Sequence, residues 1–308
     1  MRRREFVKSA AWAGLGLGLG LAGPAYAARA RMYVSLNGTL TGNKITWPEF
    51  AKLAAKTGYG GVDLNLGAAI KEGAEDTRTM LRDLKLRAAC CGCPVNAGRD
   101  EAAFKASMEK LDEAARFAAA VGCNRMTAIL PAASQTPKDE LLKTYKERYT
   151  AVAAVLAKHN VRLGFEFLGP LQFRTRQPHE FLWRMNDVVA FCKECGPNTG
   201  LLLDNWHWHH SGATVQDILK AGKSRIVTVH ISDCPKMAPE DVKDNQRLLA
   251  GEGVIDTVGF FKALKQIGYV DGISPEPLGR IPAGTSPEEG AKMGLESALA
   301  VMKKAGVA

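Results

Sequence analysis

The sequence lacks several patterns that would place it in a common class of protein. No Gly-x-Gly-x-x-Gly follows any of the early predicted strands, which argues against an open sheet that binds a dinucleotide. No lysine- and arginine-rich run is dense enough to indicate a nucleic-acid-binding surface, although the chain has a formal net charge of +9. The apolar run at residues 10–21 is shorter than the about 20 residues that a membrane-spanning helix requires.

A zinc-finger arrangement of cysteines is also missing. Cys192-x-x-Cys195 has the spacing of a redox or zinc pair, but no further pair follows at the separation that a structural zinc site requires. The chain has seven cysteines, and those in predicted inner strands have the small apolar character of buried thiols. We therefore expect one bridge or two unrelated thiols at positions 192 and 195, and reduced thiols in the core.

The first 27 residues are predicted to form an export signal. A basic start at residues 2–4 precedes the apolar, glycine-rich run, and Ala25-Tyr26-Ala27 has the pattern of a cleavage site. Four residues match the twin-arginine motif R-R-x-F-x-K: Arg3, Arg4, Phe6 and Lys8. The sequence therefore predicts recognition by the twin-arginine (Tat) export machinery and a periplasmic or otherwise exported chain of residues 28–308. An uncleaved membrane anchor is the alternative.

Short β-branched runs alternate with amphipathic stretches over the rest of the chain. We expect eight strands, at residues 32–36, 61–64, 86–91, 125–129, 162–167, 199–204, 226–231 and 271–276. We expect helices between and after them, at residues 47–56, 77–84, 101–121, 138–159, 178–195, 215–220, 256–267 and 286–304. Eight strand–helix pairs without a linker predict one (β/α)8 TIM barrel, an α/β fold that is typically about 250 residues long.

Polar residues interrupt apolar sequence at the ends of the last four predicted strands. Glu166 lies between two phenylalanines, Asp204 follows three leucines, His230 lies in a run of isoleucine and valine, and Glu276 ends the last strand. Burying such groups is costly unless they are paired or bind a metal. In a TIM barrel the carboxyl ends of the strands form the active site. Three carboxylates and one imidazole suit Mn²⁺, Mg²⁺ or Zn²⁺, so the pattern predicts one divalent metal ion.

Four segments resemble the xylose-isomerase-like TIM-barrel superfamily: Asp204-x-x-His207, His230-x-x-Asp233, residues 248–256 and residues 268–276. This superfamily includes sugar isomerases, ketose epimerases, hydroxypyruvate isomerases and inosose dehydratases. The resemblance implies that Glu166, Asp204, His230 and Glu276 are the metal ligands. It favours Mn²⁺ as the ion, with Mg²⁺, Co²⁺ and Zn²⁺ as alternatives.

The same resemblance implies roles in catalysis and substrate binding. Glu166 and Glu276 would face each other across the substrate as an acid/base pair, which moves a proton next to a metal-stabilised enediolate. His207 and Arg247 match positions that hold substrate hydroxyls or an anionic group. Trp206 is expected to contribute to a sugar-stacking wall. For the following residues, 208–210, contact with substrate and simple packing under the loop both stay open.

The sequence differs from two branches of the superfamily at positions that matter for their functions. Ketose 3-epimerases have a further carboxylate after the strand-five glutamate, and residues 168–173 contain none. The endonuclease IV branch holds a zinc cluster with histidines on strands two and three, where this chain has Asp63, Cys90 and Cys91. The second departure argues against DNA repair.

We therefore expect a metal-dependent isomerase or epimerase that removes a proton next to the carbonyl of a sugar or keto-sugar. The alternative is a lyase, dehydratase or hydrolase that uses the same first step on 3-keto-glycosides or inososes. A second alternative is a metal-dependent sugar-binding protein without catalysis. The sequence leaves the oligomeric state open, a homodimer included.

Overall fold

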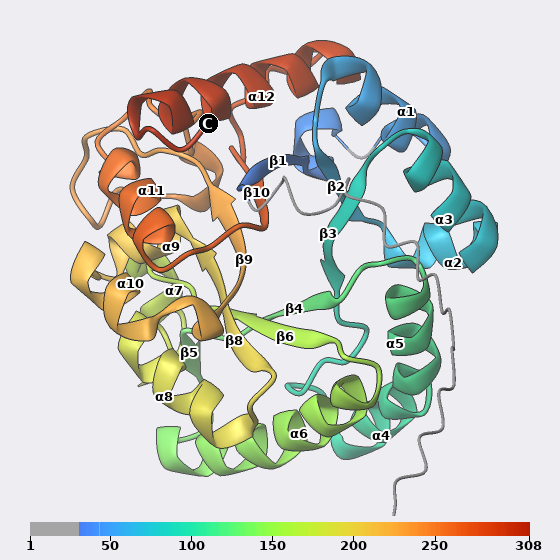
Figure 1. Cartoon of the computed structure of the whole chain (residues 1–308). Coiled ribbons are helices and arrows are strands. Elements are labelled where there is room, and N and C mark those ends of the chain that lie inside the picture. Colours follow the sequence, from blue (N-terminus) through green and yellow to red (C-terminus); the bar gives the residue numbers. More distant parts are fainter. Residues whose placement is uncertain (1–30, 43) are drawn as a thin grey trace, which may run out of the picture. The chain divides into compact units, whose positions relative to one another are not determined.

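A computed structural model describes residues 31–42 and 44–308, and the predicted export signal lies outside these residues. Eight parallel strands form a closed barrel, in the order β1-β10-β9-β8-β6-β4-β3-β2 around the ring (Figure 1). Their bounds are β1 Tyr33–Leu36, β2 Gly61–Leu64, β3 Arg87–Gly92, β4 Arg125–Ile129, β6 Arg162–Glu166, β8 Thr199–Asp204, β9 Ile226–Ile231 and β10 Gly272–Pro275. A TIM barrel of one domain is therefore confirmed.

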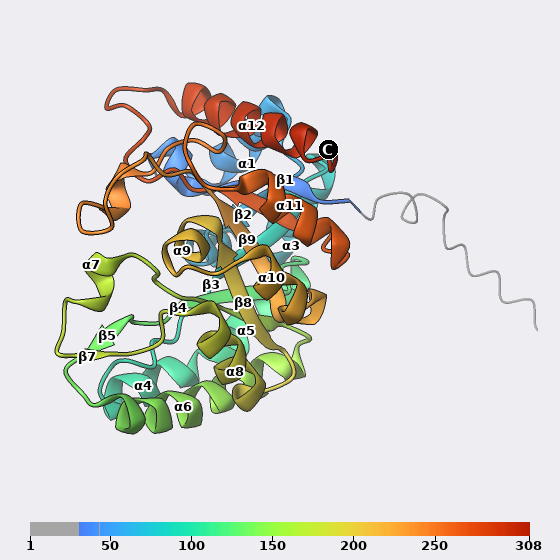
Figure 2. The ribbon, with the colours of Figure 1, turned by 90° about the vertical axis from the view of Figure 1, so that its left-hand side faces the viewer.

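Helices surround the barrel (Figure 1). Eight of them are α1 Trp47–Thr57, α3 Ala74–Asp83, α4 Glu101–Glu109, α5 Leu111–Ala120, α6 Lys138–Lys158, α8 Met185–Cys195, α11 Thr257–Gln266 and α12 Pro287–Lys304. Shorter helices are α2 Leu66–Glu72, α7 Leu171–Arg174, α9 Asn205–His210 and α10 Val215–Ala221, with 3-10 turns η1 Gly38–Thr41, η2 Lys223–Arg225 and η3 Asp244–Gln246. Two small strands, β5 Ala133–Ser134 and β7 His179–Glu180, pair antiparallel outside the barrel. Figure 2 shows α7 and the β5–β7 pair together at one end of the barrel.

Local sequence explains where the two flanking helices α1 and α12 begin. Thr46 and Glu49 form a capping box at the start of α1, and Ser286 and Glu289 form one at the start of α12. Each box satisfies two backbone N–H groups that have no partner inside the helix. In both helices a proline occupies the first turn, where its missing N–H costs nothing. These two helices pack against each other beside β1.

Two predicted helices differ from the observed ones. The stretch 101–121 is interrupted at Lys110, which separates α4 from α5; no glycine or proline in the sequence marks this break. The predicted helix 178–195 begins only at Met185. Residues 179–180 instead pair as β7 with β5, and the Phe181 N–H donates to the Ala132 carbonyl, so an extended segment takes the place of the first helical turns.

The cysteines are all part of the described chain and are free thiols. Six are buried, and Cys93 is partly buried. Cys192 and Cys195 lie within α8, where burial raises the pKa of each thiol to about 12. Such thiols are poor nucleophiles, so this pair has the character of core residues. Among the described residues, no helix is both long enough and apolar enough to cross a membrane.

Candidate metal centre

Four adjacent strands bring the predicted ligands together. Glu166 ends β6, Asp204 ends β8, His230 is the next-to-last residue of β9, and Glu276 follows β10. The register pairs Asp204 with His230, so the two residues lie side by side on neighbouring strands. One potential ligand atom from each of the four residues lies within 4.8 Å of all the others. The structure thus gathers all four predicted residues into one cluster.

The donor set fits a divalent cation. The Nδ1 atom of His230 lies 3.4 Å from Glu276 Oε2 and 4.0 Å from Glu166 Oε1. Within the described part of the chain, Glu166 Oε1 and His230 Nδ1, which face each other in this cluster, are buried without a hydrogen-bond partner of normal geometry. Buried polar atoms are rarely left unsatisfied, and two that converge indicate a binding site for a ligand. Three carboxylates and an imidazole match the preferences of Mn²⁺, Mg²⁺ or Zn²⁺.

Arg247 supplies a fixed positive charge to this cluster. It follows η3 in the segment after β9, and its side chain is only 2% exposed. Its Nη1 donates to Asp204 Oδ2 at 2.7 Å and to Glu276 Oε2 at 3.1 Å, and its Nη2 donates to Asp244 Oδ1 at 2.8 Å. These charge-assisted bonds hold the two metal-site carboxylates in place.

His207 lies beside both Arg247 and Asp204, with its Nε2 3.9 Å from Asp204 Oδ2. Its Nε2 is 3.2 Å from Arg247 Nη2, and its Nδ1 is 3.3 Å from the backbone N–H of Gly169. Burial lowers the pKa of His207 to about 4, against an opposing effect of Asp204, so the ring is neutral near pH 7. A neutral imidazole has one acceptor nitrogen, so only one of these two donors forms a full hydrogen bond with it.

Gly169 allows the loop after β6 to approach α9. A Cβ atom at this position would lie 2.2 Å from the His207 carbonyl oxygen and 2.8 Å from the Ser211 N–H nitrogen. Both neighbours are backbone atoms that cannot move away independently. The side chain of Asp204 also accepts from the Trp206 N–H, which starts α9 directly at the strand end. The β6 and β8 parts of the site are therefore locked together.

The environment shifts the pKa values of Glu166 and Glu276 in opposite directions. Burial, together with the charge of Glu276, raises the pKa of Glu166 to about 8. Burial would also raise the pKa of Glu276, but His230 and Arg247 outweigh it and lower this pKa below its usual value. For Asp204, Arg247 likewise outweighs burial and lowers the pKa. Two titratable groups whose pKa values are shifted in opposite directions are typical of an acid/base pair.

The two tryptophans of α9 pack beside the site and in the layer around it. Trp206 is fully buried, with the Arg247 guanidinium 5.3 Å from its ring centre and the His210 ring 4.6 Å away. Trp208 donates its indole N–H to the Thr214 carbonyl and packs against Phe260. The structure therefore places Trp206 in contact with Arg247, and its ring is not exposed to a substrate cavity.

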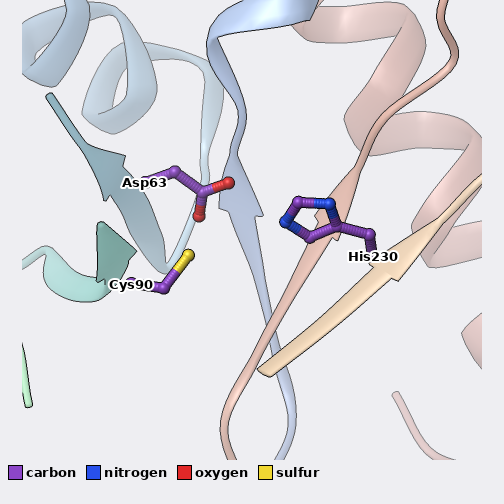
Figure 3. A group of neighbouring side chains, drawn as sticks. All are labelled: Asp63, Cys90 and His230. Carbon is purple, nitrogen blue, oxygen red and sulfur yellow. The ribbon is translucent and has the colours of Figure 1, made fainter. Parts of the chain in front are cut away.

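Sequence reasoning did not assign a role to two residues that lie next to His230. Asp63 of β2 and Cys90 of β3 point toward its ring (Figure 3), and one ligand atom from each of the three residues lies within 4.8 Å of the other two. Their only signal in the sequence is a polar residue within each of two short apolar strands.

Two cavities lie near the strand ends. The larger, of about 550 Å³, is formed by α7, α9 and the loop after β9; its described lining includes Arg174, His210, Lys236 and Met237, and no carboxylate. The smaller, of about 220 Å³, contains Asp63 beside the aromatic rings of Trp47 and Phe50. The segments that shape the larger cavity therefore follow strands that carry candidate ligand residues.

Comparison with known families decides the relationship of this chain. Residues 51–304 match the xylose isomerase-like TIM barrel family. The chain belongs to this family.

Individual relatives of the family agree with this result. An inosose isomerase of Bacillus subtilis (strain 168) is 27% identical over 139 residues, which are 45% of this chain and 48% of that protein. The chain thus matches about half the length of that curated relative. A xylose isomerase domain protein from Alicyclobacillus acidocaldarius superposes over 89% of this chain and 99% of its own, with a TM-score of 0.82 and 28% identity. The IOLI protein with a bound zinc atom shares the fold, with a TM-score of 0.75 over 89% of this chain and 98% of its own at 19% identity.

Proposed function

We propose that the chain is a divalent-metal-dependent isomerase or epimerase of a sugar, keto-sugar or inosose. The observation that carries this proposal is the cluster of Glu166, Asp204, His230 and Glu276 at four adjacent strand ends. The match to an inosose isomerase and the likeness of fold to the zinc-bound IOLI protein support it. Mn²⁺ is the ion that we propose first, with Mg²⁺, Co²⁺ and Zn²⁺ as alternatives.

The residues of the site divide the chemistry among them. A divalent ion bound to the cluster would polarise a carbonyl oxygen and its neighbouring hydroxyl. Glu276, whose pKa is low, is ready to accept the proton from the carbon next to the carbonyl. Glu166 is the second carboxylate of the pair and would return a proton to the same carbon or its neighbour. Arg247 and neutral His207 hold substrate oxygens beside this pair.

A lyase, dehydratase or hydrolase that uses the same first proton transfer is the second candidate function, and one observation favours it. The cavity of about 550 Å³ is formed by segments that follow the strands of three candidate ligands, and it would have room for the second part of a substrate larger than one free sugar. The lining residues Arg174 and Lys236 would hold an anionic or polar group there. In that case loss of a leaving group follows the first proton transfer.

The proposed location of the enzyme is separate from its chemistry. Residues 2–27 alone support export through the twin-arginine machinery and a periplasmic site of action. Replacement of Arg3 and Arg4 by lysines tests this prediction, because it should hold the full-length protein in the cytoplasm. Unchanged export of that variant would contradict it.

The function is tested by mass spectrometry of products formed in D₂O. The metal-loaded chain of residues 28–308 is incubated with keto-sugars, inososes and 3-keto-glycosides. Deuterium at a carbon next to the carbonyl, without loss of mass, supports an isomerase or epimerase, and deuterium with a released fragment supports the lyase. Glu276→Gln and Glu166→Gln should each lower the rate of exchange by at least about 100-fold.

The matched control is Glu194→Gln, which removes an exposed carboxylate paired with Lys146 and should leave the rate unchanged. Binding of these sugars without any exchange would replace the enzyme by a metal-dependent sugar-binding protein.

A further inference from the structure

A partly buried carboxylate and a buried thiol lie beside the histidine of the metal centre and have no role described so far. Asp63 and Cys90 come from β2 and β3, whereas His230 comes from β9, so the barrel brings them together across its interior. The Nδ1 atom of His230 faces Glu276, at 3.4 Å. Figure 3 shows the opposite edge of the ring, which carries the second nitrogen, facing Asp63 and Cys90.

Three neutral side chains hold Asp63 in a fixed position. Ser35 and Ser274 donate to its Oδ1 at 2.9 and 2.8 Å, and Asn37 donates to its Oδ2 at 3.0 Å. These donors come from β1, from the residue after β1 and from β10, which are the next two strands on one side of β2. A carboxylate has about four lone-pair sites, and the remaining site is on Oδ2. Asp63 is partly buried, and among the described residues its carboxylate has hydrogen bonds from these neutral donors and no ion pair.

We propose that Asp63 is a positioning residue for the metal centre: with an ion bound at Nδ1, it becomes the acceptor for the Nε2–H of His230, a nitrogen that has no hydrogen-bond partner here, and so fixes the ring with the Nδ1 lone pair toward the ion. Histidines that bind metals generally donate their second ring nitrogen to a carboxylate or carbonyl, which sets both the tautomer and the orientation. The inference rests on the metal centre and does not depend on which sugar is converted. It assigns the Ser35–Ser274–Asn37 set the task of holding Asp63.

The same three residues could instead hold a second metal ion, but the contacts favour positioning. His230 would have to bridge two ions through both nitrogens, which requires loss of both ring protons. Asp63 already accepts three hydrogen bonds and would have to bind an ion with its last lone pair. Cys90 would have to bind as a thiolate, because the thiolate is the form that binds metals.

The test is the metal affinity of variants, measured by calorimetry on the chain of residues 28–308 with Mn²⁺ and with Zn²⁺. Asp63→Ala should weaken binding by about 10–100-fold, the usual effect of removing such a partner. Asp63→Asn keeps an acceptor oxygen and should recover part of the affinity. Cys90→Ala should leave both the affinity and the stoichiometry of one ion unchanged.

The control for general loosening of the structure is Asp233→Asn. Asp233 is buried in the same part of the fold as the site, and its carboxylate accepts backbone N–H groups, from Cys234, Gly251 and Ile255. This variant should lower the melting temperature and leave the metal affinity unchanged. A second readout is nitrogen NMR of ¹⁵N-histidine protein loaded with Zn²⁺. The signals of His230 should report a proton on Nε2 in the wild type and an altered state in Asp63→Ala.

Three results would overturn the proposal. Unchanged affinity in Asp63→Ala, with loss of binding in Glu276→Gln, refutes the role of Asp63 and leaves the metal centre intact. Unchanged affinity in both variants refutes the metal centre as well. Two ions per chain, together with zinc–sulfur scattering at about 2.3 Å in X-ray absorption, would replace positioning by a second metal site.

Discussion

Removal of Arg247 should destabilise the metal-free protein far more than the metal-loaded protein. The Arg247 side chain is 2% exposed and lies 2.7 Å from Asp204, 2.8 Å from Asp244 and 3.1 Å from Glu276. Arg247→Met fills a similar volume but leaves buried carboxylates without their cation. Breaking a buried ion pair by removing one partner costs about 3–5 kcal/mol. For a chain of this size that corresponds to a fall of roughly 6–10 °C in Tm.

A bound divalent ion supplies positive charge to two of these carboxylates, so it should offset much of the cost. The assay is thermal unfolding followed by circular dichroism, once with a chelator and once with saturating Mn²⁺. The control is Arg280→Met, which removes a partly exposed ion pair with Glu252 and should cost less than about 1 kcal/mol in both conditions. An equal loss of Tm for Arg247→Met with and without metal would refute the reasoning.

Further predictions concern the loop, the pH dependence and the ion. Gly169→Ala should disturb the backbone contact with α9 and lower kcat/KM at least about tenfold, whereas Gly73→Ala, where a Cβ meets no atom within 4 Å, should affect only stability. Because burial raises the pKa of Glu166 from 4.5 to about 8, metal-free protein should lose stability as the pH rises through this range. Metal affinity measured by calorimetry should rise over the same range, as protons leave the ligands. Removal of the ion with a chelator should abolish turnover and lower Tm, and addition of Mn²⁺ should restore both.

The four candidate ligands could be identified from the sequence because each of them is a local exception. A charged or polar residue at the end of an apolar strand is visible without any structure, as at Glu166 and Asp204. The parallel barrel then requires that such ends converge. The prediction of eight strands followed from the same alternation, and four of the predicted strands have the observed bounds, 61–64, 125–129, 199–204 and 226–231.

The environment of His230 could not be predicted in the same way. Asp63 and Cys90 precede it by more than 100 residues, and only closure of the barrel brings β2 and β3 to face β9. The helix α9 was missed for a different reason. Its tryptophans and histidines are weak helix formers, and the Asp204 cap together with packing under Arg247 decides its conformation. In both cases contacts distant in sequence outweigh the local signal.

The proton affinities of the cluster indicate what the metal ion replaces. In the metal-free protein, burial favours a proton on Glu166, and the neighbouring glutamates favour one on His230. Protonated His230 and Arg247 then carry two positive charges against the three negative charges of Asp204, Glu276 and Asp244. When both protons leave, Glu166 adds a fourth carboxylate that faces Arg247, and a divalent ion restores the same net charge. A cation of charge +2 that exchanges with about two protons therefore leaves the net charge of the site unchanged, and Arg247 supplies its fixed positive charge.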